Sequence, residues 1–272
     1  MSTKPMLPGS KWLKHSIIAR SAELRKSLPD SALYSYAQLE RYLNRYKTVF
    51  VKPTIGGGGH NIFCVKRLEE GGYLVKMERK RMQTSSLRRI HDWITESARQ
   101  KHRTFMIQQG IDLALWRGRP VDLRTIVQKN HRGDWEVTGM FSKIAGKDLA
   151  ITNVSAGGTA HSVEEYLTAL GYKQTESQAI LRSLNSVSLG IARQFGRTYG
   201  NATYGLDIGL DRQGKLLLIE ANTVPRIDIF LLLKMPRSYA RAKKLWDLYS
   251  SANDMATKKY RGRQRAEREQ RR

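Results

Sequence analysis

The sequence predicts a mixed α+β protein, because segments with the two-residue period of strands alternate with segments that have the period of helices. The clearest strand signal lies at residues 204–222, where two apolar runs flank the turn sequence Asp211-Arg-Gln-Gly214, as in a β-hairpin. The clearest helix signal is the capping-box sequence Ser162-x-x-Glu165. With 272 residues and 40% hydrophobic content, the chain can bury the core of one or two domains.

The order of the elements follows from the same patterns. Residues 1–47 should form a loop and then a helix capped by Asp30 or Ser31, because Leu33, Leu39 and Leu43 recur at helical spacing. Two strands, at residues 48–53 and 61–66, should be joined across the glycine cluster of residues 56–59. The remaining strands are expected at residues 104–109, 121–128 and 135–144, and the remaining helices at residues 86–101, after Ser162-x-x-Glu165, after Thr175-x-x-Gln178 and after Pro236.

Composition excludes several classes of protein. No apolar run approaches the roughly 20 residues of a membrane-spanning helix, and residues 1–20 lack the apolar centre of a signal peptide. The single cysteine, Cys64, excludes an intramolecular disulfide and a multi-cysteine metal site, and its apolar neighbours predict core packing. These features are typical of a cytoplasmic protein, which is the location we expect.

The chain is strongly basic, with 48 lysine and arginine residues against 24 acidic residues and a formal net charge of +24. A basic surface attracts polyanions through counterion release, although a solubilising surface explains the charge equally well. Residues 258–272 contain eight basic and two acidic residues without apolar periodicity. We therefore expect a disordered basic tail.

Three oxygen-bearing residues of the expected hairpin form a candidate metal site. A two-residue loop between Asp211 and Gly214 would place Asp207 opposite Leu218, so that Asp207, Glu220 and Asn222 share one face. The other face, directed to the core, would carry Leu206, Ile208, Leu217, Ile219 and Ala221. Clustered carboxylates repel one another unless a cation joins them, and Mg2+ accepts such oxygens and leaves positions for phosphates. A Mg-nucleotide site is one interpretation, and an exposed hairpin with scattered acidic residues is the other.

A candidate phosphate-binding loop follows Lys52, which lies on an apolar strand directly before Pro53. Gly56, Gly57, Gly58 and Gly59 come next, and glycines allow backbone N–H groups to approach phosphate oxygens while a lysine supplies positive charge. The loop joins two strands and lacks the Lys-Ser/Thr end of a Walker A motif. A flexible hairpin turn would explain the glycines equally well.

A cationic pair is expected on two neighbouring strands. Alternation along residues 121–128 places Asp122 and Arg124 on one face, where the arginine requires an anionic partner. Asp122 could be that partner, in a purely structural ion pair. A hairpin at residues 130–134 would bring Lys143 alongside Arg124.

Four passages in this order resemble the ATP-grasp superfamily, and within it the spore-coat-associated YheC/YheD type. They are Phe50-Val-Lys52-Pro53 before the glycines, Val121-Asp122-Leu-Arg124-Thr-Ile-Val-Gln128, Thr152-Asn153-Val-Ser-Ala-Gly157-Gly158, and the hairpin with Asp207 and Glu220-x-Asn222. They lie within residues 42–228, about two thirds of the chain. The resemblance implies an ATP-grasp fold, in which two α+β subdomains sandwich ATP. The full N-terminal domain that usually precedes this fold is not expected, because only 51 residues precede Lys52.

The resemblance also implies a division of the chain and a role for each candidate residue. Residues 1–47 would be an N-terminal helical segment, 48–110 the small lid subdomain, 111–257 the large subdomain with the metal site, and 258–272 the tail. The implied ligands are ATP and Mg2+, with the metal held by Asp207, Glu220 and Asn222. The other implied contacts are Lys52 and Gly56–Gly59 with phosphates, Gln108, Gln109 and Ile111 with adenine, Asp112 with ribose, and Arg124 and Lys143 with phosphate or the acceptor carboxylate.

Two functions from different classes follow from these observations. The resemblance implies an ATP-dependent carboxylate–amine ligase that forms an amide through an acylphosphate, with an unidentified acceptor and a spore-coat association. The alternative is a non-catalytic basic module that uses the same fold to bind a polyanion or a coat component. The +24 charge favours the module, and the complete metal set favours the enzyme.

Overall fold

The computed structural model describes residues 5–57, 59–100, 103–146, 158–252 and 254, and confirms the mixed α+β class with antiparallel sheets. Contacts divide the chain into two compact units. The larger unit comprises Met1–Gly9, Lys14–Leu28 and Leu113–Arg272, and the smaller unit comprises Ser10–Leu13 and Pro29–Asp112. No helix in the described ranges is both long and apolar enough to cross a membrane.

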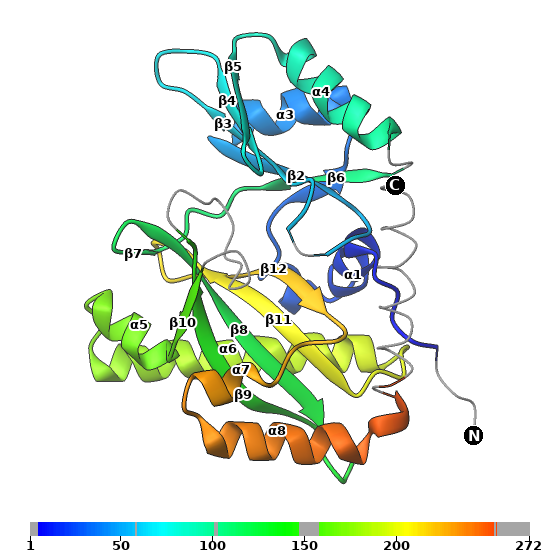
Figure 1. The fold of residues 1–272 in the computed structure, drawn as a ribbon, viewed down its shortest axis with the longest axis vertical. Helices are drawn as coiled ribbons and strands as arrows, with labels where there is room; N and C mark the ends of the chain where they lie inside the picture. The colour runs from blue at the N-terminus through cyan, green and yellow to red at the C-terminus, as the bar shows by residue number, and fades with distance from the viewer. Residues whose placement is uncertain (1–4, 58, 101–102, 147–157, 253, 255–272) are drawn as a thin grey trace. The chain divides into compact units, whose positions relative to one another are not determined.

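The smaller unit is a six-stranded antiparallel sheet with helices on one face (Figure 1). The strands follow the order β1 (Ser31–Leu33), β6 (Phe105–Gln109), β2 (Thr48–Pro53), β3 (Phe63–Arg67), β4 (Tyr73–Met77) and β5 (Lys80–Thr84). Helices α3 (Tyr36–Arg45) and α4 (Leu87–Arg99) bury Leu39, Ile90 and Ile94 against Val49 and Val51. The side chains that alternate with Val49 and Val51 therefore lie on the face that α3 and α4 do not cover.

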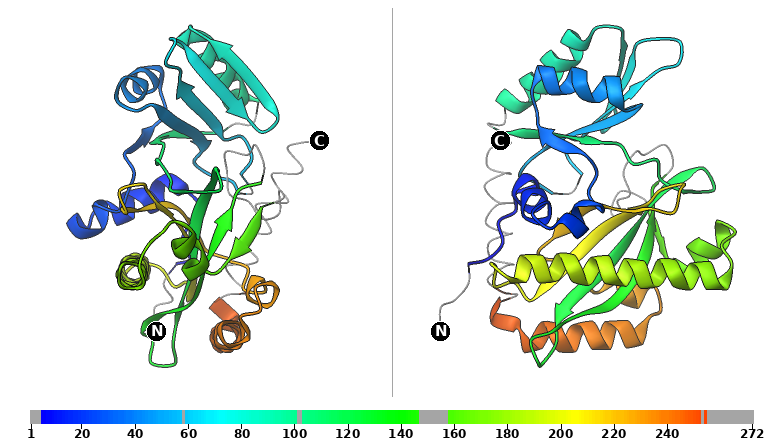
Figure 2. Two further views of the ribbon diagram at one scale, coloured as in Figure 1. Left: turned by 90° about the vertical axis from the view of Figure 1, so that its left-hand side faces the viewer. Right: turned by 180° about the vertical axis from the view of Figure 1, so that it is seen from behind.

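The larger unit is built on a second antiparallel sheet, with a long helix on each face (Figure 2). Its strands follow the order β10 (Thr159–His161), β9 (Trp135–Ile144), β8 (Arg119–Lys129), β11 (Thr203–Leu210) and β12 (Leu216–Asn222), and β7 (Leu115–Trp116) pairs with β8. Helix α6 (Gln174–Gly196) packs on one face, where the hydroxyls of Ser188 and Thr125 lie 2.9 Å apart. The remaining helices are α1 (Lys11–Ile18), α2 (Ala22–Arg25), α5 (Val163–Ala169), α7 (Ile229–Leu232) and α8 (Pro236–Leu248).

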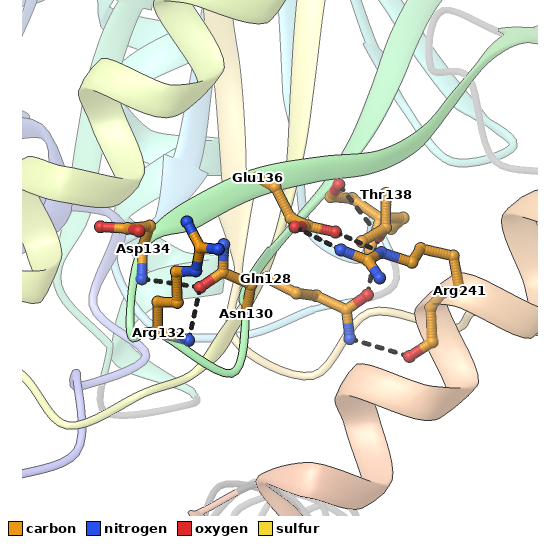
Figure 3. A network of polar contacts seen from close by, with 9 residues as sticks. Gln128, Asn130, Arg132, Asp134, Glu136, Thr138 and Arg241 are labelled. Atoms are coloured by element: carbon orange, nitrogen blue, oxygen red, sulfur yellow. Dashed lines mark hydrogen bonds and ion pairs between the residues drawn. The ribbon is translucent and has the colours of Figure 1, made fainter.

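Helix α8 is attached to the other face of the larger sheet by polar contacts at the β8–β9 end (Figure 3). Arg241 pairs with both oxygens of Glu136, at 2.6 and 2.7 Å, and Gln128 donates to the carbonyl of Ala242 at 3.1 Å. The same helix covers Ile126 and Phe141 together with Phe230 of α7. Further along this face, β8 and β11 carry the candidate site.

Several expected boundaries were wrong. Residues 31–33 form β1 rather than the start of a helix, and α3 begins later, at Tyr36, because the Ser35 hydroxyl accepts a hydrogen bond from the Gln38 N–H. The box expected at Thr175-x-x-Gln178 is also displaced, since α6 begins at Gln174 and the Lys173 N–H donates to Glu176 at 2.7 Å. Strands β4 and β5 were not predicted. The box at Ser162 and Glu165 is confirmed.

Candidate functional site

The hairpin of β11 and β12 differs from the expected one at two places. The Asp211 N–H donates to the Lys215 carbonyl, so the loop has three residues and ends at Gly214, whose φ of +80° suits glycine. A bulge at Ile219 adds a second one-residue shift, and Asp207 lies opposite Glu220 instead of Leu218. The two shifts restore the original alternation. The expectation that Asp207, Glu220 and Asn222 share a face is therefore confirmed, by a different register.

The core face of the hairpin changes accordingly. Leu218 pairs with Ile208 on the core face, whereas Leu217 pairs with Gly209 and lies on the face of Asp207. The expectation that Leu217 and Ile219 alternate regularly into the core was wrong, because the bulge takes Ile219 out of the pairing. Leu217 is nevertheless buried, at 4% exposure.

The centre of the candidate site is a buried ion-pair cluster around Asp207. Arg124 lies directly opposite Asp207 on β8 and holds both of its carboxylate oxygens, with Nε–Oδ1 at 2.5 Å and Nη2–Oδ2 at 2.7 Å. The Lys143 ammonium lies 2.8 Å from Asp207 Oδ1 and 3.1 Å from Asp122 Oδ1. Asp122, Lys143 and Asp207 are each less than 10% exposed. The structural alternative, an ion pair of Arg124 with Asp122, is replaced by a pair with Asp207, because β11 places Asp207 opposite the arginine.

The charged side chains of the cluster stabilise one another's ionised forms. Burial alone would raise the pKa of Asp207, but the charges and hydrogen bonds of Arg124 and Lys143 outweigh it and hold that pKa well below its usual range. Burial likewise opposes the charged form of Arg124, whereas Asp207, Asp122 and Glu220 favour it, and its pKa is raised. Asp207 is therefore ionised at neutral pH.

Glu220 and Asn222 complete the oxygen-rich face. Glu220 is half-buried opposite Asp207, and the Asn222 amide donates to Asp207 Oδ2 at 3.2 Å. Among the described residues, no three acidic, histidine or cysteine side chains gather into a metal-binding group. The candidate set instead offers two carboxylates and one amide, which fits Mg2+, an ion that takes one or two carboxylates together with substrate phosphates.

Lys14 is a charged residue near this face that the sequence did not single out. It lies on α1 and is 7% exposed, and its ammonium donates to the Ala221 carbonyl at 2.6 Å, between Glu220 and Asn222 along β12. Its spacing from Ile17 and Ile18, three and four residues on, is the signal that could have identified it, because it places Lys14 on the buried side of the helix.

The smaller unit carries the expected phosphate-binding residues. Lys52 is 6% exposed on the sheet face away from α3 and α4, and its ammonium donates to Gln108 Oε1 at 2.6 Å. Gly56 and Gly59 have positive φ angles of 138° and 78°, and the Gly56 carbonyl accepts from the Lys11 ammonium at 2.5 Å. Gly57 is among the described residues, whereas Gly58 lies outside them, as do Asn153, Gly157 and residues 258–272.

The residues expected at adenine and ribose are not gathered on one surface by the sheet. Gln108 lies beside Lys52, but Gln109 points to the opposite face, where its Oε1 accepts from the Asp30 N–H at 3.2 Å. The Gln109 N–H also donates to the Asp30 carbonyl, at 2.8 Å. Ile111 is half-buried and Asp112 is exposed, both beyond the end of β6. Their roles stay predictions.

A family model of YheC/D-like ATP-grasp proteins matches residues 4–251, nearly the whole chain. The chain belongs to the YheC/D-like ATP-grasp family. It is 30% identical over 227 residues to the endospore coat-associated protein YheD of Bacillus subtilis (strain 168), covering 81% of this chain and 49% of YheD. It is 21% identical over 217 residues to YheC of the same organism, covering 79% of this chain and 59% of YheC.

The ATP-grasp fold is also seen in the solved structures. A D-alanine-D-alanine ligase from Coxiella burnetii superposes with a TM-score of 0.53 at 12% identity, covering 95% of this chain and 61% of the ligase. The similarity concerns the fold, and it confirms the fold predicted from the four passages. The chain spans about half the length of YheD and about three fifths of YheC and of the ligase.

Proposed function

We propose that this YheC/D-like ATP-grasp chain binds Mg-ATP and acts as an ATP-dependent carboxylate–amine ligase. The observation that carries the proposal is the cluster in which Arg124 and Lys143 converge on Asp207, beside Glu220 and Asn222. Buried cations and carboxylates are costly to maintain, and they are retained where a site must stabilise developing charge. Family membership supports the nucleotide, since the whole of β8, β11 and β12 lies inside the matched residues.

Each residue of the cluster has a task in this proposal. Asp207, Glu220 and Asn222 would hold Mg2+, which neutralises charge on the transferred phosphoryl group. Arg124 offers a rigid fork of donors for a phosphate or carboxylate, and Lys143 offers a compact charge beside it. Both cations contact Asp207. We expect both cations to contact the phosphates or the acceptor carboxylate when Mg-ATP is bound.

The charges of the cluster predict the relative affinities for Mg2+, ATP and Mg-ATP. Arg124 and Lys143 oppose the approach of a free divalent cation to Asp207, whereas ATP supplies the negative charge that both cations accept. We expect weak binding of Mg2+ alone, moderate binding of ATP in EDTA and tight binding of Mg-ATP. Isothermal titration of the three combinations tests this order, and tight Mg2+ binding without nucleotide would contradict it.

The metal contribution is tested with Glu220→Gln, which keeps the size of the side chain and removes its charge. Affinity for Mg-ATP should fall at least about tenfold, the scale on which single ligands affect metal sites, while affinity for ATP in EDTA stays the same. Glu164→Gln on α5 is the matched control, because Glu164 is exposed on a helix outside the cluster. Equal losses of Mg-ATP affinity in both variants would show that Glu220 does not bind the metal.

The ligase reaction is tested by trapping its intermediate. With carboxylate fractions from a cell extract, hydroxylamine should intercept an acylphosphate as a hydroxamate and ADP should appear in equal amount. Arg124→Lys should reduce both products, because lysine cannot reproduce a forked contact. ADP release without any hydroxamate, across fractions that contain acceptor carboxylates, would favour a different phosphoryl acceptor.

A non-catalytic module that binds a polyanion or a coat component is the second candidate, favoured by the net charge of +24. YheD and YheC of Bacillus subtilis are endospore coat-associated proteins. We propose the same association here, with synthesis in the cytoplasm and with residues 258–272 as a separable polyanion-binding tail. A fluorescent fusion in sporulating cells should follow the coat, and uniform fluorescence would contradict the association.

A further inference from the structure

A chain of side-chain hydrogen bonds crosses three neighbouring strands of the smaller unit, from β1 through β6 to β2. The Ser31 hydroxyl donates to the Pro29 carbonyl at 3.0 Å and accepts from Gln108 Nε2 at 3.1 Å. The amide oxygen of Gln108 in turn accepts from the Lys52 ammonium at 2.6 Å. Ser31 lies directly opposite Gln108 in the register of β1 and β6, and Lys52 lies diagonally from Gln108 on β2. The chain therefore connects the lysine expected at the phosphates to a serine that has no other assigned role.

The two ends of this chain fix the direction of the Gln108 amide. A carbonyl oxygen only accepts, so the single hydrogen of the Ser31 hydroxyl is directed to Pro29, and the Ser31 oxygen accepts from an amide N–H. An ammonium group only donates, so Lys52 requires the amide oxygen. Both neighbours therefore select the same one of the two amide orientations.

Reversal of the amide would be costly, because Gln108 and Lys52 are only 7% and 6% exposed. A reversed amide would direct its NH2 group at the Lys52 ammonium and its oxygen at the Ser31 oxygen. Buried polar groups that face such partners lose their hydrogen bonds without replacement by water. In the proposed complex Lys52 also contacts phosphates, so Ser31 is the neighbour that orients the amide both with and without nucleotide.

The Ser31 hydroxyl is not needed to attach β1 to the sheet, because backbone hydrogen bonds do so on both sides of it. One joins the Gln109 N–H to the Asp30 carbonyl at 2.8 Å. The other joins the Tyr34 N–H to the Phe105 carbonyl at 3.0 Å. The contribution of the hydroxyl is therefore to the Gln108 amide rather than to strand pairing.

We propose that Ser31 is a positioning residue that makes the nucleotide site select a 6-aminopurine over a 6-oxopurine. The amide oxygen of Gln108 has two acceptor positions, and Lys52 occupies one of them. The second accepts the exocyclic amino group of adenine, whereas guanine carries at that position an oxygen, which the amide oxygen repels. Ser31 keeps the NH2 end of the amide away from the base. This inference rests on the proposed binding of Mg-ATP.

The test is isothermal titration of the full chain with Mg-ATP and with Mg-GTP. Wild type should bind ATP at least about tenfold more tightly than GTP, because one hydrogen bond replaces a repulsive contact. Ser31→Ala should weaken ATP and strengthen GTP, because the amide can then reverse once Lys52 contacts phosphate. The ratio of the two affinities should fall at least about fivefold. Ser31→Thr keeps the hydroxyl and should retain the wild-type ratio within about twofold.

Two comparisons separate this role from a general loss of stability. Ser35→Ala is the matched control, because it removes the hydroxyl that caps α3 and should lower the melting temperature without changing the ATP-to-GTP ratio. The second comparison repeats Ser31→Ala in the Gln108→Glu background. There the substitution should no longer change the ratio, because both ends of a carboxylate are oxygens and no orientation has to be selected.

Failure of the Ser31 role and failure of the proposed function give different results. An unchanged ratio in Ser31→Ala, in a protein that binds Mg-ATP, would overturn the role of Ser31 and leave the proposed function standing. Equal weakening of both nucleotides, or the same change of ratio in Ser35→Ala, would make the Ser31 hydroxyl structural and would also overturn its role. A wild-type protein that binds neither nucleotide would overturn the proposed function, and this inference with it.

Discussion

Arg124 and Asp207 lie directly opposite each other on β8 and β11 and form a forked ion pair, with Nε–Oδ1 at 2.5 Å and Nη2–Oδ2 at 2.7 Å. The pair is almost completely buried: its side chains are 15% and 7% exposed. Lys143 approaches the same carboxylate from β9. One carboxylate thus organises three strands, which gives Asp207 a structural role in addition to the metal role proposed for it.

The structural role of Asp207 is tested by Asp207→Asn. The amide cannot neutralise Arg124 and Lys143, which would stay buried with excess positive charge, and breaking a buried pair in this way costs about 3–5 kcal/mol. Urea denaturation at pH 7 should show a loss of that size in the free energy of unfolding. Asp228→Asn is the control, because its pair with Arg226 is exposed and should contribute at most about 1 kcal/mol. Similar losses in the two variants would contradict the account.

The same carboxylate predicts a pH dependence. The pKa of Asp207 is lowered in the folded protein relative to the ordinary aspartate value of about 3.9 in the unfolded chain. Its contribution to stability is therefore fully present above about pH 4 and is lost as the pH falls toward the folded-state pKa. Between pH 5 and pH 2, the unfolding free energy of wild type should fall more steeply than that of Asp207→Asn. If the unfolding free energies of the two proteins depend on pH in the same way, folding does not stabilise the ionised form of Asp207.

Lys52 is tested by substitution with methionine, which preserves most of the buried stem and removes the charge. We expect affinity for ATP to fall about tenfold or more, as for the loss of a charged hydrogen bond of about 1.5–3 kcal/mol, with a small change in melting temperature. Lys47→Met is the matched control, since Lys47 is exposed and pairs with Glu69. A large decrease in melting temperature with unchanged ATP affinity would mean that Lys52 mainly supports Gln108, its partner at 2.6 Å.

Cys64 should be a slow thiol. Burial raises its pKa to about 11, although Lys76 and Lys66 oppose the shift. The thiolate fraction at neutral pH is then roughly three-hundredfold below that of an ordinary cysteine with a pKa near 8.5. Iodoacetamide alkylation, followed by mass, should be correspondingly slow and should accelerate as the pH rises past 9. Lys76→Gln should slow it further, and a faster reaction would contradict the predicted field.

Local patterns were sufficient to predict the long strands of both sheets. Residues 48–53 and 135–144 form strands with the predicted limits, because uninterrupted apolar alternation fixes both ends. β4 and β5 were missed because their exposed face carries Lys76, Arg81 and Gln83, which mask the alternation. β1 was read as helix since its three residues precede a true helix and derive their pairing from β6, a partner 75 residues away in the pairing of Ala32 with Ile107.

The candidate site was predicted in part, because strand alternation fixes which residues share a face. The shared face of Asp207, Glu220 and Asn222 follows from the two-residue period of a strand. The three-residue loop and the bulge at Ile219 each shift the register by one residue, and together they preserve this face. The choice of partners could not be predicted. Arg124 pairs with Asp207 rather than Asp122 because β11 lies beside β8, and this neighbourhood is a property of the whole sheet. Lys14 was missed although its spacing from Ile17 and Ile18 places it on the buried side of α1, because a lysine is ordinarily expected on the exposed side of a helix.

Substitution of Gly205 tests how tightly the β11–β12 hairpin is packed beside the Arg124–Asp207 ion pair. A Cβ atom at this position would lie 2.6 Å from Pro225 Cβ and 3.5 Å from Arg124 Cδ, so Gly205→Ala must displace Pro225 or the strand itself. Overpacking of this kind typically costs about 1–3 kcal/mol. We expect that loss in urea denaturation, together with weaker Mg-ATP binding, because β11 carries Asp207 two residues further on. Gly205→Ala/Pro225→Gly should recover part of the stability, because glycine removes the clashing Cβ atom. If the double variant is no more stable than the single one, the strain lies in the strand rather than in the contact with Pro225.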